Sequence, residues 1–345
     1  MATVAFHTLG CKVNSYESEA MLEIFKKRGY DNIDFESPAD VYVINTCTVT
    51  NTGDSKSRQM IRKAHRTNPD AVICVVGCYS QVASEEITEI EGVSVVLGTQ
   101  HRASIVDFVE EYKMTHKQIV KIENVMKVSR FEDLSIHAFE NKTRAFLKIQ
   151  DGCNNFCTYC IIPYARGGVR SRPKEDVLRQ AQELVDRGFV EIVLTGIHTA
   201  GYGVDLDNYS FYDLLVDLTT KIKGLKRLRI SSIEMSQVSD EIIELIGRSP
   251  IIVDHLHIPI QSGTDSILRR MARHYNTAEF EKKYFELKEA LPGISITTDV
   301  IVGFPGETEE DFVDTYNWIK KLHFNQLHVF PYSRRKGTPA DRMPS

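Results

Sequence analysis

The sequence has no long apolar run and no excess of positive charge. Among its 345 residues there is no uncharged stretch of roughly 18 residues, the length that a membrane-spanning helix needs. The N-terminus also lacks a basic segment followed by an apolar one, so we expect no signal peptide, no membrane partner and a cytoplasmic protein. Lys and Arg number 42 against 47 Asp and Glu, a balance that does not predict a general nucleic-acid binder.

Cysteine is scarce, and its number is odd. The chain has seven cysteines, at positions 11, 47, 74, 78, 153, 157 and 160. In a long chain without a secretion signal, this number argues against a disulfide framework and favours metal binding or catalysis.

The first third of the chain alternates short β-branched runs with helix-length segments. The runs predicted to be buried parallel strands are residues 3–8, 41–45, 71–77 and 93–98. The segments predicted to be helices are residues 14–28, 54–67 and 83–91. This order predicts an α/β domain, with a flavodoxin-like, doubly wound parallel sheet.

Three cysteines of this domain each follow a predicted strand. Cys11, Cys47 and Cys78 come after the first three strands, whose carboxyl ends share one edge of a parallel sheet. They are therefore expected to converge, either as metal ligands or as small buried residues. Cys74 lies in mid-strand, which favours a core position.

A second alternating series follows a polar segment at 112–143, for which we expect a connection with an edge hairpin. Its predicted strands are residues 145–150, 191–196, 227–232, 255–260, 294–303 and 326–332. Its predicted helices are residues 174–187, 211–222, 238–247, 277–290 and 308–321. Six strand-helix steps predict a partial (βα)6 barrel with its chemistry at the carboxyl ends of the strands.

The stretch DGCNNFCTYC, which follows the first of these six strands, places three cysteines at C-x3-C-x2-C spacing. Structural zinc sites take four ligands from paired motifs, and no second such pair is present in the sequence. Iron-sulfur clusters are held by clustered thiolates, and a cubane with three protein ligands leaves one iron open to another ligand.

Cys153, Cys157 and Cys160, with Tyr159 before the last of them, resemble the signature of radical S-adenosylmethionine enzymes. The resemblance implies that the open iron chelates S-adenosylmethionine and that an electron from the reduced cluster cleaves it to a 5'-deoxyadenosyl radical. The strand-end residues that match positions binding S-adenosylmethionine in this superfamily are Thr195, Gly196, Ser232, Glu234, Gln261 and Val302.

The chain also resembles a narrower group, the methylthiotransferase family. This resemblance rests on four stretches: TLGCKVNSYES, VINTCTVTNTGDSKSR, GCYSQ and GCNNFCTYCIIPYARG. This resemblance implies a second 4Fe-4S cluster on Cys11, Cys47 and Cys78. The motifs are most similar to the branch that methylthiolates N6-threonylcarbamoyladenosine beside the tRNA anticodon. The alternatives within the family are N6-isopentenyladenosine in tRNA and a ribosomal protein.

The resemblance also sets the expected organisation and partners. We expect a methylthiotransferase domain at 1–125, a linker at 126–143 and a radical S-adenosylmethionine domain at 144–345. The family's C-terminal RNA-binding (TRAM) domain is expected to be absent, because the chain ends at GTPADRMPS. The expected partners are tRNA and a reductant such as flavodoxin or ferredoxin. The sequence does not indicate the sulfur donor.

Either the sequence is a truncated piece of a longer chain, or RNA contact comes from the residues present. In the second case, contact is expected from arginines near the loop cysteines, namely Arg166, Arg170 and Arg172. Other basic groups, such as Arg58, Arg62 and Arg66 at helical spacing, are more typical of a solvated face.

Two further patterns are given structural roles. Thr308 and Asp311 predict a capping box. His255 and His257 share one strand face, for which a core or supporting role is favoured over a metal pair.

Two functions of other classes also account for the cysteines. One is a two-cluster electron carrier, and the other is a zinc-dependent module that binds nucleic acid. Neither requires polar groups at the ends of six successive barrel strands.

Overall fold

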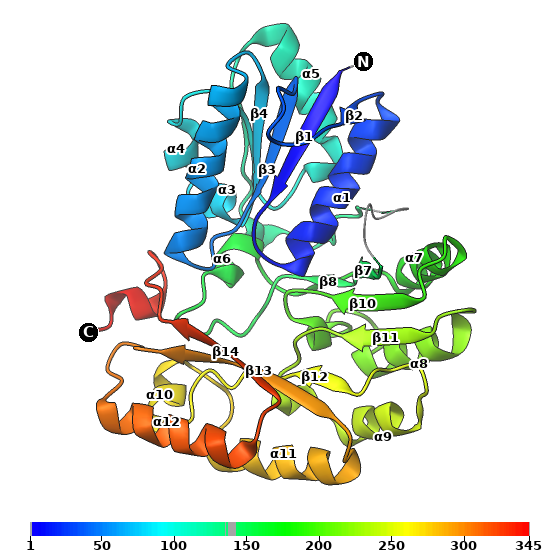
Figure 1. The fold of residues 1–345 in the computed structure, drawn as a ribbon, viewed down its shortest axis with the longest axis vertical. Coiled ribbons are helices and arrows are strands. Elements are labelled where there is room, and N and C mark those ends of the chain that lie inside the picture. The colour runs from blue at the N-terminus through cyan, green and yellow to red at the C-terminus, as the bar shows by residue number, and fades with distance from the viewer. Residues whose placement is uncertain (1, 135, 137–142, 345) are drawn as a thin grey trace. The chain divides into compact units, whose positions relative to one another are not determined.

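The computed structural model describes residues 2–134, 136 and 143–344. The chain forms two compact units (Figure 1). The N-terminal unit comprises residues 1–142, 151–154 and 161–170, and the C-terminal unit comprises residues 143–150, 155–160 and 171–345. The boundaries expected from the sequence, at 125 and 143, remain predictions, and positions 135 and 137–142 of the expected linker lie outside the described residues.

The N-terminal unit is built on one six-stranded parallel sheet with the order β2-β1-β3-β4-β5-β6. Its strands are β1 (Thr3–Thr8), β2 (Asp31–Asn32), β3 (Val41–Thr46), β4 (Val72–Gly77), β5 (Val93–Leu97) and β6 (Ile119–Lys121). The four predicted strands are therefore confirmed. β6 is a parallel edge strand, however, so the expected edge hairpin is wrong.

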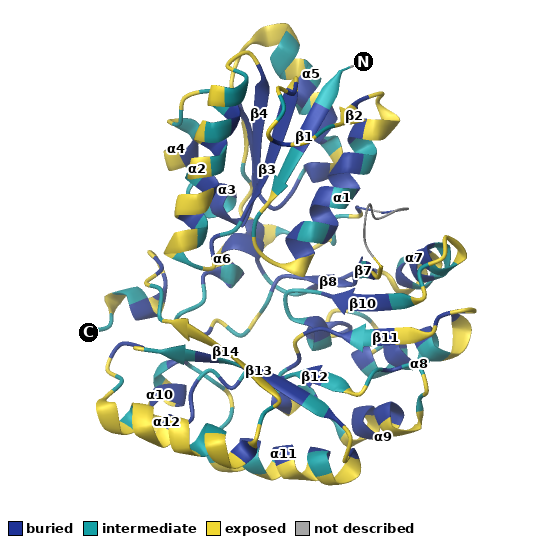
Figure 2. Cartoon of the chain, viewed as in Figure 1, coloured by how far each residue is buried: buried dark blue, intermediate teal, exposed yellow. Residues whose placement is uncertain are grey.

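Helices cover both faces of this sheet. They are α1 (Lys12–Lys27), α2 (Asn51–Thr67), α3 (Cys78–Val82), α4 (Ser84–Thr88) and α5 (Ile105–Thr115), with short turns η1 (Arg102–Ser104) and η2 (Val125–Lys127). Apolar residues of α1 and α5 pack on one face, and those of α2, α3 and α4 pack on the other. Every residue of β3 and β4 is consequently buried (Figure 2). Cys74 lies in this core with no exposed surface, as predicted.

The predicted helix at 83–91 is present as the shorter α4, and an additional short helix, α3, precedes it. Gly77, at the end of β4, has φ of +104°, a backbone conformation that a residue with a side chain rarely adopts. This turn lets α3 begin directly at Cys78, so a helix starts where the sequence pattern suggests only the end of a strand.

The C-terminal unit contains two three-stranded parallel sheets, ordered β11-β10-β7 and β12-β13-β14. Their strands are β7 (Ala145–Lys148), β10 (Glu191–Thr195), β11 (Arg227–Ile230), β12 (His255–His257), β13 (Ser295–Val302) and β14 (Gln326–Pro331). Single parallel bridges, Leu228 to Ile252 and Ser232 to His257, join the β11 and β12 segments. The six-unit partial barrel expected from the sequence is confirmed.

The remaining elements of the chain belong to one or the other unit. They are β8 (Gln150–Asp151), α6 (Ile162–Arg166), β9 (Arg170–Ser171), α7 (Lys174–Asp186), η3 (Thr199–Gly201), α8 (Phe211–Lys221), η4 (Met235–Gln237), α9 (Asp240–Arg248), α10 (Asp265–Arg270), α11 (Thr277–Ala290), α12 (Glu309–Leu322) and η5 (Pro339–Arg342). The predicted capping box at the start of α12 is present: Asp311 N donates to Thr308 Oγ1, and Thr308 N donates to the Asp311 carboxylate.

A search of the described residues finds no helix that is both long enough and apolar enough to cross a membrane.

Candidate metal centres

Three cysteines of the N-terminal unit follow three neighbouring strands. β1, β3 and β4 lie side by side in parallel register, and Cys11, Cys47 and Cys78 come just after their carboxyl ends. The turn before Cys11 lies close to Cys47, because a Cβ added at Gly10 would be 2.9 Å from Cys47 Sγ. The topology therefore brings these cysteines to one edge of the sheet, as predicted. We call them the sheet-edge cysteines.

The sheet-edge cysteines differ in exposure. Cys11 is exposed, Cys47 is half-buried and Cys78 is buried. Burial raises the pKa of the Cys78 thiol to about 12, although the neighbouring Arg166 guanidinium acts in the opposite direction. Burial also raises the pKa of Cys47, and the nearby Cys11 adds to that shift. These thiols keep their protons at neutral pH unless a cation displaces them.

Arg166 donates directly to one of these thiols. Its Nε lies 3.2 Å from Cys78 Sγ, and its two terminal nitrogens form a bidentate pair with Glu17 at 2.8 and 3.0 Å. Asp151, at 3.1 Å, and the Asn14 side-chain oxygen, at 2.9 Å, complete the shell. Burial alone would lower the pKa of Arg166, but Cys78 and the two carboxylates hold it well above its usual range. A fixed positive charge thus faces the sulfur.

The network around Arg166 extends away from the thiol. Glu17 also pairs with Arg102 at 2.6 Å, and both side chains are fully buried. Arg102 in turn pairs with Glu132 at 2.7 Å. Several buried charges therefore depend on one another, and removing one leaves the others desolvated and unpaired.

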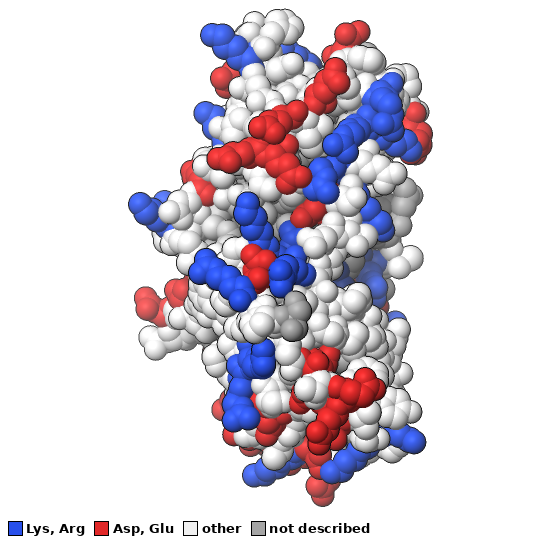
Figure 3. All heavy atoms as spheres, turned by 90° about the vertical axis from the view of Figure 1, so that its left-hand side faces the viewer, with Lys and Arg blue, Asp and Glu red and all other residues white. Residues whose placement is uncertain are grey.

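The three arginines predicted to contact RNA are buried, and RNA contact through them remains a prediction. Arg166, Arg170 and Arg172 expose 0, 2 and 1% of their surface. Arg170 donates to the Gly168 carbonyl and Arg172 to the Gln180 side chain. Their charge is therefore used inside the protein. On the face drawn in Figure 3, groups of Lys and Arg alternate with groups of Asp and Glu, so that face has no continuous basic surface.

The loop cysteines, Cys153, Cys157 and Cys160, lie between β8 and α6. In the N-terminal unit, Cys153 N donates to the Gly167 carbonyl at 3.0 Å. In the C-terminal unit, Cys160 N donates to the Cys157 carbonyl at 2.9 Å, which closes a turn. Thr158, inside this turn, donates through its backbone N to the Met271 carbonyl at 3.0 Å. Backbone hydrogen bonds therefore shape the loop that carries the three cysteines.

A second arginine lies beside a loop cysteine. Arg273 Nη1 is 3.4 Å from Cys157 Sγ and 3.1 Å from Glu234 Oε1. Glu234 also accepts a hydrogen bond from the Asn155 amide at 2.9 Å. Only 5% of the Arg273 side chain is exposed, so this residue is not part of a solvated basic face. Glu234, expected at a cofactor position, therefore already orients two neighbours.

The other predicted cofactor residues lie at strand ends of the C-terminal unit. Thr195 is the last residue of β10, with Gly196 next, and Val302 is the last residue of β13. Ser232 and Gln261 make single bridges to His257 and Val300, respectively. The placement of these residues matches the predicted carboxyl edge, whereas their binding of S-adenosylmethionine remains a prediction.

The Gln261 backbone has φ of +65°, and its N and O atoms pair with Asp299 O and Ile301 N in β13. Tyr159 stacks edge-on against Phe304, with ring centroids 6.5 Å apart, beside an apolar cluster. A binding role for either residue also remains a prediction.

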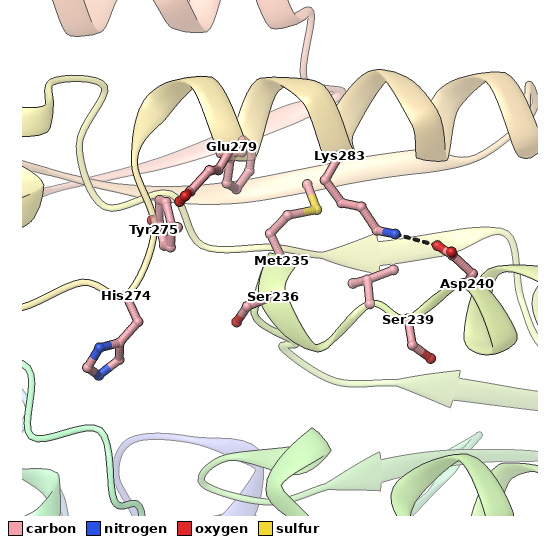
Figure 4. Close-up of a pocket in the computed structure, with 10 residues that line it drawn as sticks. Met235, Ser236, Ser239, Asp240, His274, Tyr275, Glu279 and Lys283 are labelled. Atoms are coloured by element: carbon pink, nitrogen blue, oxygen red, sulfur yellow. Dashed lines mark hydrogen bonds and ion pairs between the residues drawn. The ribbon is translucent and has the colours of Figure 1, made fainter.

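A separate cavity of about 470 Å³ lies between η4, α9 and the start of α11 (Figure 4). Lys283 reaches across it to Asp240 at 2.6 Å, while the His274 side chain extends to one side. Its lining contains none of the cysteines and none of the predicted cofactor residues. This cavity is therefore not part of either cysteine site.

Sequence reasoning missed the polar partners of the thiols. Asn14 and Glu17 are within the quoted motif TLGCKVNSYES, three and six residues after Cys11, on the first turns of α1. This helical spacing from Cys11 could have indicated that both side chains lie near the sheet-edge cysteines. Arg273 had none, because its partner Cys157 is 116 positions away in sequence.

Comparison with known proteins places both halves of the chain. The family model of the Radical SAM superfamily matches residues 147–319, and that of the Uncharacterized protein family UPF0004 matches residues 3–98. Among solved structures, the chain resembles the radical S-adenosylmethionine methyltransferase TsrM from Kitasatospora setae. The TM-score is 0.71 at 14% identity, over 99% of this chain and 74% of that one. This likeness concerns the fold alone.

Relatives of known name are much more similar in sequence. Threonylcarbamoyladenosine tRNA methylthiotransferase MtaB from Bacillus subtilis is 60% identical over 99% of this chain and 76% of its own length. The protein of the same name from Aquifex aeolicus is 41% identical, over 99% and 82%. tRNA-2-methylthio-N(6)-dimethylallyladenosine synthase from Finegoldia magna is 36% identical, over 98% and 74%. The chain therefore belongs to the radical SAM superfamily and, within it, to the tRNA methylthiotransferases.

Proposed function

We propose that this chain methylthiolates N6-threonylcarbamoyladenosine in tRNA to the 2-methylthio derivative. The observation that carries the proposal is the 60% identity, over almost the whole chain, to a relative named for this activity. Relatives named for dimethylallyladenosine are 35 to 38% identical. The threonylcarbamoyl branch is therefore favoured over the isopentenyl branch.

The donor sets fit two iron-sulfur clusters. Six of the seven cysteines fall into two sets of three, and the seventh, Cys74, is enclosed in β4. Three thiolates hold a 4Fe-4S cluster with one iron open. In the proposal, the loop cysteines hold the cluster whose open iron takes S-adenosylmethionine, and the sheet-edge cysteines hold a second cluster. A cluster held by the loop cysteines and reduced by a small electron carrier, such as flavodoxin or ferredoxin, would supply the electron for reductive cleavage of S-adenosylmethionine.

The protein's own groups orient and tune these sites. Arg166 and Arg273 each donate to one cysteine sulfur, at 3.2 and 3.4 Å. A hydrogen bond from a cation stabilises the thiolate over the thiol and withdraws charge from the sulfur. The polar residues at the ends of β10 and β11 and beyond β12 supply carbonyls and side chains for the amino acid and ribose groups of S-adenosylmethionine.

Mass spectrometry of tRNA nucleosides tests the function. A strain without the gene should lose 2-methylthio-N6-threonylcarbamoyladenosine and keep the precursor, and the wild-type gene should restore the product. A gene carrying Cys157→Ala should not restore it. Loss of the methylthio group from isopentenyladenosine instead would select the other branch, and unchanged nucleosides would refute both.

A further inference from the structure

Three neighbouring strands of the C-terminal unit bring two histidines and an aspartate together. β12 pairs with β13 so that His257 is opposite Thr297, and β13 pairs with β14 so that Asp299 is opposite His328 (Figure 1). Side chains alternate between the faces of a strand. Ile296, Thr298 and Val300 therefore share one face of β13, and Thr297 and Asp299 share the other. All three groups therefore share one face.

The reactive atoms of these residues converge. His257 Nε2 is 3.1 Å from one oxygen of Asp299, and His328 Nδ1 is 3.2 Å from the other. One ligand atom from each residue lies within 4.8 Å of both others. In a tetrahedral or octahedral site, neighbouring ligands about 2.0 to 2.2 Å from the ion are roughly 2.8 to 3.6 Å apart. The two distances to Asp299 are of this size. The separations therefore leave room for one cation among them after small adjustments.

A neighbouring hydroxyl fixes one of the rings. Thr297 Oγ1 is 2.9 Å from His257 Nδ1, so the Nε2 atom of the same ring is directed at Asp299. Histidines that bind metals usually have such a partner on the second ring nitrogen, which sets their orientation. His255 contacts the same hydroxyl at 3.2 Å but is outside the group of converging atoms.

Exposure keeps the group accessible. The side chains of His257, Asp299 and His328 are 15, 27 and 43% exposed. Sites of this kind in enzymes use three protein ligands and keep a further position for water or another oxygen ligand.

We propose that His257, Asp299 and His328 bind a divalent transition-metal cation of the zinc class, independently of the cysteines. Two imidazoles and one carboxylate are a ligand set that such ions accept. This replaces the interpretation of His255 and His257 as residues with only a core or supporting role. His257 acts with partners from the next two strands, and His255 supports Thr297.

Zinc binding to the protein with its clusters in place tests the site. The protein is incubated with zinc under anaerobic conditions, desalted and analysed for zinc, and the zinc K-edge absorption spectrum is recorded. We expect about one zinc per chain with nitrogen and oxygen ligands near 2.0 to 2.1 Å and histidine scattering. Sulfur at about 2.3 Å would place the zinc at cysteines and overturn the proposal.

Variants locate the ion. His328→Ala changes a partly exposed residue and should lower zinc affinity at least about tenfold in competition with a chelator, as should Asp299→Asn. Thr297→Ala should weaken binding by about 10- to 100-fold through the loss of orientation. His116→Ala, an exposed histidine of the other unit, is the matched control and should retain zinc. If the wild type binds no zinc, or His328→Ala binds it equally well, the three residues form only an ion-pair network.

Discussion

The two cysteine sites differ in how firmly an arginine is held beside a thiol. Arg166 is fully buried and touches two carboxylates, an amide oxygen and the sulfur of Cys78. Arg273, beside Cys157, has one carboxylate partner, Glu234, whose side chain is 17% exposed. The first arginine is held by several buried groups inside its unit. The second pairs with a single carboxylate that is partly exposed.

Two arginines that make similar contacts with sulfur can therefore contribute differently to the stability of the fold. A buried charge network is costly to break, because each remaining group is desolvated. A pair at a partly exposed edge can be resolvated, so its loss costs less. We therefore expect Arg166 to be needed for folding as well as for the thiol, and Arg273 to act mainly on its thiol.

The largest expected effects separate the chemical roles of the two sites. Cys157→Ala should abolish S-adenosylmethionine cleavage, because one ligand of the proposed radical cluster is lost. Cys47→Ala should leave cleavage measurable but reduce methylthiolated product below detection. Both are measured by chromatography of 5'-deoxyadenosine and of tRNA nucleosides in the same reaction. Methylthiolated product from Cys47→Ala would contradict the assigned role of the sheet-edge cysteines.

The next effect concerns stability. Arg166→Ala should lower the free energy of unfolding by about 3 to 5 kcal/mol, because Glu17 and Asp151 lose a buried partner. Arg273→Ala should cost less, about 1 to 3 kcal/mol. Urea unfolding at matched iron content, followed by circular dichroism, measures both.

The matched control for the stability comparison is Arg62→Ala on the solvent side of α2, which should stay within about 0.5 kcal/mol of the wild type. Equal losses for Arg166→Ala and Arg273→Ala would remove the distinction between the two sites.

The smallest effect compares one helix cap from each unit. Thr50 caps α2 with its hydroxyl alone, whereas Thr308 caps α12 together with Asp311. A hydrogen bond from Ser266, with others from Thr308, lowers the pKa of Asp311 below its usual 3.8. Its stabilising effect is therefore complete above that value and is lost as the pH falls through the lowered pKa.

Thr50→Ala and Asp311→Ala should each cost about 1 kcal/mol at pH 7. The difference between the wild type and Asp311→Ala should shrink below about pH 4. For Thr50→Ala it should stay constant, because a hydroxyl does not titrate there. Unfolding curves measured between pH 2.5 and 7 compare the two, and a constant difference for Asp311→Ala would show that its charge is not involved.

Much of the fold could be predicted because its signals are local. Runs such as 41–46 and 72–77 are mostly apolar and are buried along their whole length, as is typical of central parallel strands. Two elements, β6 and α5, were missed. β6 has only three residues, and α5 mixes apolar with polar residues and ends inside the region predicted to be a polar connection. Tertiary packing on β5 decides both elements.

The convergence of the sheet-edge cysteines could be predicted because each follows a strand, but the partners of the arginines could not. Arg166 was predicted to contact RNA, since it lies with Arg170 and Arg172 near the loop cysteines in sequence. Its partner Glu17 is 149 positions away, and no local pattern reveals that pairing. For the same reason, Asp299 and His328 became neighbours only through the register of β13 and β14.

Iron analysis of three proteins tests most directly whether two separate regions each hold a cluster. The wild type should contain about eight irons per chain after anaerobic reconstitution. Two triple variants are compared with it, Cys11→Ala/Cys47→Ala/Cys78→Ala and Cys153→Ala/Cys157→Ala/Cys160→Ala. Each variant should keep about four irons. Only the variant that lacks the sheet-edge cysteines should still cleave S-adenosylmethionine. A wild type with about four irons, or a triple variant that keeps all eight, would contradict the account.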